Sequence, residues 1–169
     1  MADFSPYITL EDTSVKLVLE EPRWRQRLHF FLLRILPIML AITFFIGIAH
    51  SDFPNHLQII ISIFFVVYVA VLLNISYIVK AEITPIAVVI TSNRLFNTTD
   101  ETIVISDVEK IVSRIRHGKH KALLYYLVLK TNRKRKRFLS FNRFHITDAN
   151  RSLINNKLQA ITGLPASNL

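Results

Sequence analysis

Five consecutive basic residues stand between two apolar runs in the stretch KTNRKRKRFLSF, residues 130–141. Guanidinium and ammonium groups bind phosphate and carboxylate oxygens, so such a run can bind lipid headgroups, nucleic acid or an acidic protein surface. It can also be the solvated tip of a hairpin. No acidic residue lies between Lys110 and Thr147, and more basic residues occur there. The predicted lipid- or partner-binding residues are Arg133, Lys134, Arg135, Lys136, Arg137, Arg114, Arg116, Lys119 and Lys121.

Other residues with chemical potential give weaker patterns. His117 and His120 have a spacing that can bind a metal ion, but Lys119 and Lys121 beside them would repel a cation. Cysteine is absent, which excludes disulfides and thiolate chemistry. There is no glycine-rich phosphate loop, nucleophile elbow or two-histidine metalloprotease motif. We therefore expect a non-enzymatic protein with no catalytic residues, no metal and no cofactor.

The composition indicates lipid rather than water around part of the chain. Of its 169 residues 51% are hydrophobic, yet the formal net charge is +9. A length of 169 residues allows one domain and little more. An apolar composition of this kind is unusual in a water-soluble domain, and the excess positive charge belongs to the C-terminal half.

Two apolar segments, 28–49 and 57–79, are each long enough for a membrane-spanning helix, which needs roughly 20 residues. We expect a transmembrane helical hairpin over 28–79, a cytoplasmic N-terminal segment over 1–27 and a cytoplasmic domain over 80–169. The first segment contains Arg34 and Pro37. Arg34 either extends to the membrane interface or faces an acidic group on another subunit. Pro37 is expected to kink the helix unless neighbouring groups bind the freed carbonyl.

The flanking charges predict the orientation of this hairpin. The short connection HSDFPNH, residues 50–56, contains no lysine or arginine, whereas basic residues flank the two outer ends. The positive-inside rule then places both termini in the cytoplasm of a prokaryotic cell, with a multi-pass anchor in its cytoplasmic (inner) membrane. The expected membrane-interface residues are Trp24, Arg25, Arg27, Arg34 and Lys80.

After the hairpin, short alternating apolar runs predict strands. ITPIAVVIT is expected to be a strand, with a turn at Ser92 and Asn93; RLFNT and ETIVIS are expected to be strands around a turn at TDE, residues 99–101. SDVEKIV has capping-box spacing and predicts either a short helical turn or a bent strand.

The last third has the clearest local signals. ALLYYLVLKT is rich in aromatic and β-branched residues, and KRFLSF is expected to be its hairpin partner, with NRKRKR at the tip. A cap at Thr147 or Asp148, apolar residues Ile154, Leu158 and Ile161, and Gly163 as a stop predict one amphipathic helix. Strands followed by a closing helix make an α+β or partly open barrel domain of roughly 80 residues, near the lower size limit for an independent core.

The stretch from Ala87 to Thr131 resembles the bacterial pleckstrin-homology-like domains that follow a two-helix membrane hairpin. Such domains have a strand ending in threonine, an Arg-Leu pair, another strand and an Asp-containing turn, and Thr91, Arg94, Leu95, Ile105 and Asp107 occupy these places. The glycine common after the Arg-Leu strand is replaced by TTDE. The resemblance implies a small PH-like β-barrel or sandwich with a C-terminal helix and a binding or scaffolding role.

These observations together predict a membrane-anchored scaffold or accessory subunit of a larger membrane complex, whose basic domain docks on anionic lipid or an acidic partner. The alternatives are an independent anionic-lipid-binding anchor and a membrane-tethered nucleic-acid binder. Nucleic acid is the least expected partner, because no base-stacking motif and no recognition helix can be identified.

Overall fold

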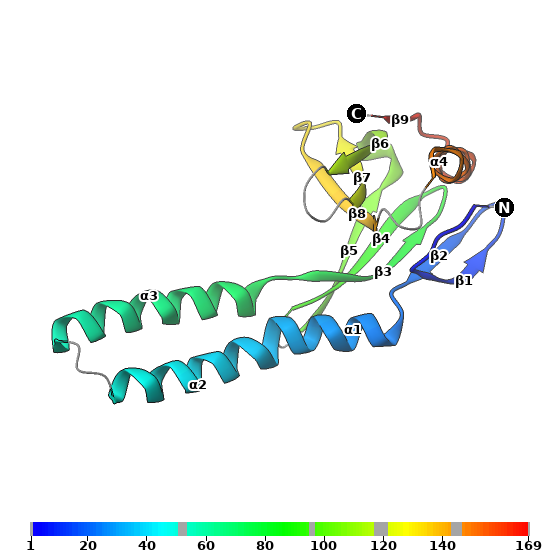
Figure 1. Cartoon of the computed structure of the whole chain (residues 1–169). Helices are drawn as coiled ribbons and strands as arrows, with labels where there is room; N and C mark the ends of the chain where they lie inside the picture. The colour runs from blue at the N-terminus through cyan, green and yellow to red at the C-terminus, as the bar shows by residue number, and fades with distance from the viewer. Residues whose placement is uncertain (1, 51–53, 95–96, 117–121, 143–146, 169) are drawn as a thin grey trace. The chain divides into compact units, whose positions relative to one another are not determined.

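A computed structural model describes residues 2–50, 54–94, 97–116, 122–142 and 147–168. The chain forms two compact units (Figure 1). The helical unit contains Arg23–Tyr77 and Asn93–Thr98; the sheet unit contains Met1–Pro22, Ile78–Ser92 and Thr99–Leu169. The chain is therefore an α+β protein.

The helical unit is a hairpin of two long helices. The first runs without a break through α1 (Arg23–Phe30), a π-helical segment η1 (Phe31–Ile35) and α2 (Leu36–Ala49), and the second is α3 (Asn55–Asn74). Figure 1 shows α2 and α3 side by side, and the rings of Phe44 and Phe65 stack between them with centroids 4.0 Å apart. Both helices are long and apolar enough to cross a membrane.

The predicted helix limits need correction at both ends. The first helix begins at Arg23, five residues before the predicted segment, and the second ends at Asn74 rather than at 79. The last residues of the second apolar segment belong to strand β3 (Tyr77–Ile83). An apolar run does not by itself distinguish a helix from a buried strand, and Ile78, Val79 and Tyr77 are residue types that favour strands.

The sheet unit contains two sheets. The first has the order β1 (Ile8–Asp12), β2 (Leu17–Glu20), β3, β4 (Ala87–Asn93) and β5 (Thr98–Val104). A 3-10 turn (Ile105–Asp107) leads to the second sheet, which has the order β8 (Arg135–Asn142), β7 (Ala122–Leu129), β6 (Val108–Arg116) and β9 (Ala166–Asn168). In this sheet β7 pairs in antiparallel register with both β6 and β8, whereas β9 pairs in parallel with β6.

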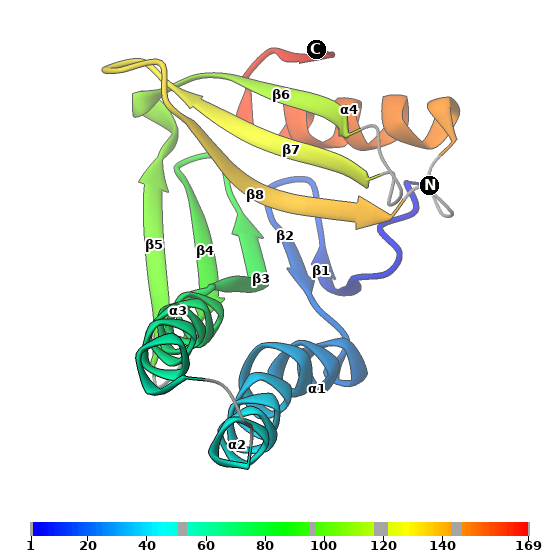
Figure 2. The same cartoon turned by 60° about the vertical axis from the view of Figure 1, so that its left-hand side comes forward.

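Helix α4 (Asp148–Thr162) lies between β8 and β9 in the chain and has the local signals that the sequence predicted. The Thr147 side chain accepts from the Asn150 N–H at 3.2 Å, and Gly163 ends the helix with φ 69°. Ile154, Leu158 and Ile161 are all buried, as their spacing predicted. Figure 2 shows α4 alongside the strands of the second sheet.

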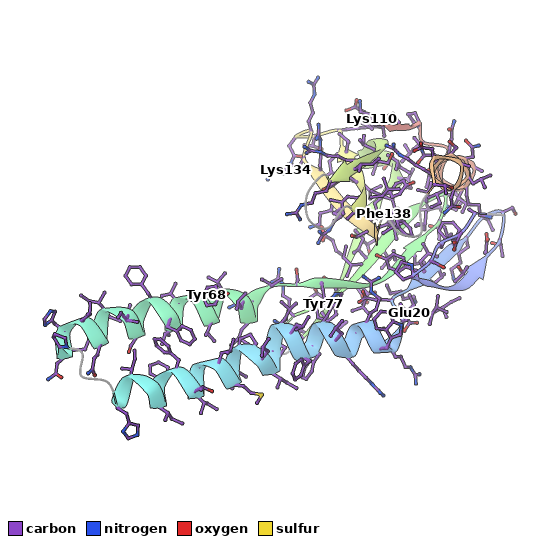
Figure 3. All side chains as sticks on the ribbon, in the orientation of Figure 1. Glu20, Tyr68, Tyr77, Lys110, Lys134 and Phe138 are labelled. Atoms are coloured by element: carbon purple, nitrogen blue, oxygen red, sulfur yellow. The ribbon has the colours of Figure 1, made fainter. Side chains whose placement is uncertain are left out.

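One apolar core joins both sheets and α4. Leu17, Ile83 and Val88 come from the first sheet, Tyr125 and Phe141 from the second, and the buried face of α4 completes it. Phe138 also lies inside, whereas Lys110 and Lys134 lie at the surface (Figure 3). The described strands form two open sheets and no closed barrel, so the barrel form of the predicted fold is not found.

The N-terminal residues are part of this unit and not a separate segment ending at residue 27. Strand β2 pairs with β3 in antiparallel register, Leu17 opposite Ile83. The Asp3 N–H donates to Asn150 Oδ1 and Asn150 Nδ2 donates to the Asp3 carbonyl, both at 2.7 Å. The Tyr7 hydroxyl donates to the Ser140 carbonyl at 3.0 Å. The N-terminus thus contributes two strands and a set of hydrogen bonds to the fold.

Two predicted turns are wrong. Ser92 and Asn93 are the last residues of β4, and the predicted turn TDE lies within β5. The polar side chains form bonds between strands: Ser92 Oγ and Thr99 Oγ1 are 3.2 Å apart, and Thr98 Oγ1 donates to Asn93 Oδ1 at 2.7 Å. In the predicted strand RLFNT, Leu95 and Phe96 lie outside the described residues.

Candidate anion-binding surface

Five of the six basic residues in the described strands of the second sheet lie on the face turned away from the core. Register pairs place Lys110 opposite Val128, and Val128 opposite Arg135, so these three residues form one row across β6, β7 and β8. The next row contains Val112, Tyr126 and Arg137. Because residues paired across strands share a face, and alternate residues along a strand share it too, Arg114 and Arg116 lie on the same side. We call Lys110, Arg114, Arg116, Arg133, Arg135 and Arg137 the basic face.

A buried apolar strip lies beneath these charges. Val112, Leu124 and Val128 are 1%, 8% and 6% exposed, although they do not belong to the main core. The chain provides long basic side chains around them, whose alkyl stems can cover apolar surface while the charged ends stay in water. The basic face therefore combines a hydrophobic base with mobile cationic ends.

One end of the basic face is hollowed. A depression of about 310 Å³ is lined by Lys110, Arg133 and Arg135 together with Glu109, Ser167 and the two valines, Val112 and Val128. Among the described lining residues Glu109 contributes the one carboxylate, and its Oε1 lies 3.8 Å from Lys110 Nζ. Three cations and one anion around a hollow leave net positive charge, which suits a phosphate or carboxylate group.

The turn before β8 places Arg133 at this hollow. The Leu129 N–H donates to the Lys134 carbonyl and the Arg133 N–H donates to the Leu129 carbonyl, each at 3.0 Å. Asn132 Oδ1 accepts from the Lys134 N–H at 2.9 Å. Arg133 has φ 51°, a left-handed conformation that is uncommon for a residue other than glycine. The turn is thus closed by its own backbone and by Asn132.

The two lysines of the predicted basic run, Lys134 and Lys136, do not belong to the basic face. Lys136 pairs with Leu127, which belongs to the core side of β7, and its Nζ lies 2.7 Å from Glu101 Oε2 on β5. Lys134 has the same parity in the chain as Lys136 and does not line the hollow. The strand therefore starts inside the run, at Arg135, and the tip predicted over NRKRKR is confined to the residues before it.

The structure brings together five of the nine predicted binding residues and adds Lys110. Lys119 and Lys121, like His117 and His120, lie outside the described residues. Sequence reasoning did not select Lys110, although its spacing from Arg114 and Arg116 is the even spacing of one strand face.

The predicted membrane-interface residues differ in their exposure and in the elements to which they belong. Trp24 is 63% exposed on α1, and Arg27 is exposed one turn further along. Arg25 is half-buried. Lys80 lies in strand β3, six residues after the end of α3, and its Nζ is 3.6 Å from Glu82 Oε2. The sequence had predicted that Lys80 directly follows a membrane-spanning helix, and in the structure it does not.

The structure gives Arg34 hydrogen-bond partners that the sequence did not identify. Its side chain is buried within the helical hairpin, with 3% exposure. Nη2 donates to the Ile75 carbonyl at 2.8 Å, and Nη1 donates to the carbonyls of Leu72 at 3.3 Å and Leu33 at 3.2 Å. A guanidinium suits the C-terminal end of α3, because unpaired carbonyls and the helix dipole make that end negative.

The Leu33 carbonyl is the group that Pro37 leaves without a helical donor, because proline has no N–H. Arg34 supplies the missing donor, and the π-helical segment absorbs the change in register, with the Leu36 N–H bonded to the Phe31 carbonyl. Arg34 therefore joins the proline site of the first helix to the end of the second.

Among the described residues, no group of three histidine, aspartate or glutamate side chains is placed to hold a metal ion. Comparison with protein-family models finds no match, and comparison with curated proteins finds no relative.

Proposed function

We propose that this protein is anchored in a membrane by its helical hairpin. The best evidence is that the surface of the two helices is apolar and uncovered. No residue in the apolar 18-residue stretch of α3 is buried by protein, and Phe64 is 74% exposed. Apolar surface of this extent on a soluble protein requires a partner, whereas lipid covers it without one.

The hydrogen bonds of polar side chains on the two helices support the same proposal. Thr43 Oγ1 donates to the Met39 carbonyl at 2.8 Å, and Asn74 Nδ2 donates to the Ala70 carbonyl at 2.9 Å. Arg34 is bonded to three carbonyls. Polar groups within the hydrocarbon core of a bilayer must find partners inside the protein, and these side chains do so.

The sheet unit would then be a PH-like binding module, with both chain termini in the cytoplasm of a prokaryotic cell. Its strands followed by the closing helix α4 support this assignment, as does the basic character of the exposed sheet face. The charge bias of the flanking segments supports the orientation.

The function that we propose is that of a non-enzymatic scaffold or accessory subunit of a larger membrane complex, whose basic face docks on anionic lipid headgroups or an acidic partner. The observation that supports it best is the alignment of Lys110, Arg135 and Arg137 with Arg114 and Arg116 on one sheet face. A basic residue at an anionic membrane surface contributes about 1 kcal/mol, so five or six of them suffice to hold a tethered unit.

The basic run provides a matched pair of variants to test this docking. Arg135→Gln with Arg137→Gln removes two charges from the basic face. Lys134→Gln with Lys136→Gln removes two charges from the same stretch of sequence, at the alternate positions that do not belong to the basic face. The full chain is purified from its host in mild detergent, and co-purifying proteins and nucleic acid are identified. Hydrogen exchange is then measured in nanodiscs with and without anionic lipid.

We expect the arginine pair to lose a stoichiometric membrane partner, or the protection of β6–β8 by anionic lipid, and the lysine pair to keep both. Equal losses in the two variants would mean that net charge, not the basic face, controls binding. Nucleic acid that co-purifies and is released by salt would favour the nucleic-acid binder instead. A protein protected by lipid and without a partner would be an independent lipid-binding anchor.

A further inference from the structure

We propose that the helical unit holds one anionic phospholipid in a groove beside α1 and η1, with the phosphate at the N-terminal end and an acyl chain along the apolar end. This inference rests on the membrane anchoring proposed above. The groove has a volume of about 600 Å³ and lies wholly among residues of the helical unit. That size falls within the range of about 300–1,000 Å³ that is usual for small-molecule sites.

The N-terminal end of the groove is basic. Arg23, Gln26 and Arg27 line it from α1, and Arg23 and Arg27 are one helical turn apart, so their side chains share a face. Both arginines are exposed, and the described residues provide neither guanidinium with an ion pair. None of the described residues that line the groove is acidic. Two guanidinium groups at this spacing can bind one phosphate from two sides, each through a pair of hydrogen bonds.

The other end of the groove is apolar. Phe30, Phe31 and Ile35 line it where the helix enters its long apolar part. Since each helical residue adds 1.5 Å, Phe30 and Ile35 lie roughly 10–18 Å from Arg23, and roughly 4–12 Å from Arg27, along the axis. Charge followed by hydrocarbon over such a length matches a phospholipid, which has its phosphate and its chains in that order. A free phosphate or a soluble anion would leave the apolar end empty.

The wall opposite α1 is held in place by a short network of hydrogen bonds. Asn93 Nδ2 donates to the Tyr77 hydroxyl at 3.4 Å, and Asn93 Oδ1 accepts from Thr98 Oγ1 at 2.7 Å. The ring of Tyr77 contacts that of His29, with centroids 5.0 Å apart. Because the Tyr77 oxygen accepts a hydrogen bond here, its own O–H can donate to a phosphate oxygen. A wall fixed in this way lowers the cost of ordering the site when lipid binds.

The test uses the full chain, purified in a neutral detergent and examined by native mass spectrometry with phosphatidylglycerol or phosphatidylcholine of the same chains. We expect the wild-type chain to retain one phosphatidylglycerol under activation that removes phosphatidylcholine. Arg23→Gln with Arg27→Gln should lower the retained fraction about tenfold or more, the equivalent of one lost hydrogen bond to a charged group. Ile35→Asn should lower it as well, because it makes the apolar end polar.

Lys134→Gln with Lys136→Gln is the matched control, since it removes two positive charges that line neither the groove nor the hollow of the basic face. It should retain the lipid, and because the groove variants leave every residue of the basic face in place, failure of the groove and failure of the docking surface are separate results. Retention of phosphatidylglycerol by the Arg23 and Arg27 variant at the wild-type level would overturn the proposal. So would equal retention of phosphatidylcholine by the wild type, or complete displacement of the lipid by excess inorganic phosphate. Helical circular dichroism identical to wild type shows that each variant is folded.

Discussion

Replacing Arg34 by methionine should destabilise the hairpin, and replacing Pro37 by alanine should restore part of the loss. In the wild type the Arg34 guanidinium donates to the carbonyls of Leu33, Leu72 and Ile75. Methionine fills a similar volume but donates nothing. The Leu72 carbonyl keeps the Ile75 N–H, 3.2 Å away, as a second partner. The substitution therefore removes the donor to two carbonyls, one at the proline and one at the end of α3.

The magnitude follows from the cost of leaving those groups unpaired. A buried carbonyl that loses its donor costs about 1–3 kcal/mol, so two of them give about 2–6 kcal/mol. Hydrogen bonds measured inside membrane proteins lie at the low end, near about 0.6 kcal/mol each, because the separated helices also find partners. We expect a loss of about 2 kcal/mol for Arg34→Met. Alanine at position 37 restores an N–H for the Leu33 carbonyl and should recover about 1 kcal/mol beyond its effect in the wild type.

The assay is a double-mutant cycle in mixed micelles, with unfolding by a denaturing detergent followed by helical circular dichroism. Trp24, the single tryptophan of the chain, gives an independent fluorescence signal near one end of the helix. Arg27→Met is the control, because it removes the same charge from an exposed position of the same helix. Independent sites add within about 0.3–0.5 kcal/mol. An Arg34–Pro37 coupling below that limit, or an equal loss in Arg27→Met, would refute the assignment of Arg34 as donor to the proline site.

Two further predictions concern the sheet unit. Gly163→Ala should cost about 1 kcal/mol in thermal unfolding, because φ is 69° and an added Cβ meets no atom within 4 Å; a larger loss would mean that backbone conformation is not the only cost. Burial raises the pKa of the Tyr125 hydroxyl, and the charge of Arg151 only partly opposes this shift. The stability that this group contributes is present below its unfolded pKa of about 10 and is lost as pH rises above it, so Tyr125→Phe should weaken the alkaline loss of stability; an unchanged profile would contradict the assignment.

The elements predicted best are those whose signals lie within a few residues. Helix α4 has its cap, its apolar spacing and its terminal glycine inside one stretch, and the structure confirms all three. The β7–β8 hairpin is confirmed for the same reason. The turns at 92–93 and 99–101 failed because polar residues were interpreted as solvated, whereas hydroxyls and amides there pair between strands.

The N-terminal strands were missed for a different reason. β1 and β2 are short, with five and four residues, and the sequence around them is charged. The sequence did contain one local signal, because Thr13 lies between two short β-type runs. In the structure its Oγ1 accepts from the Lys16 N–H at 2.9 Å in the turn that joins them. The place of β2 beside β3 depends on contacts across some sixty residues of chain, which local patterns do not contain.

The position of Arg34 also depends on a long-range contact. Its sequence neighbours indicate a charge in an apolar helix, for which an interface or a partner is the natural destination. Its bond partners at the end of α3, Leu72 and the capping residue Ile75, are 38 and 41 residues away in the chain. Only the pairing of the two helices shows that the end of one provides the acceptors for a charge in the other. Pro37 was the one local clue, because it predicted a free carbonyl near Arg34.

A run of five charges can place at most three on one face of a strand, since side chains alternate between faces. The other members of the basic face must therefore come from neighbouring strands, and here they do so with the same spacing of two, at Arg114 and Arg116 on β6. The sequence contains both spacings, but only the register of β6, β7 and β8 shows that they coincide. The count of charges measures how strongly an anion is attracted, whereas their alignment in rows determines where it binds. That distinction is why the arginine and lysine pairs of one short run are expected to behave differently.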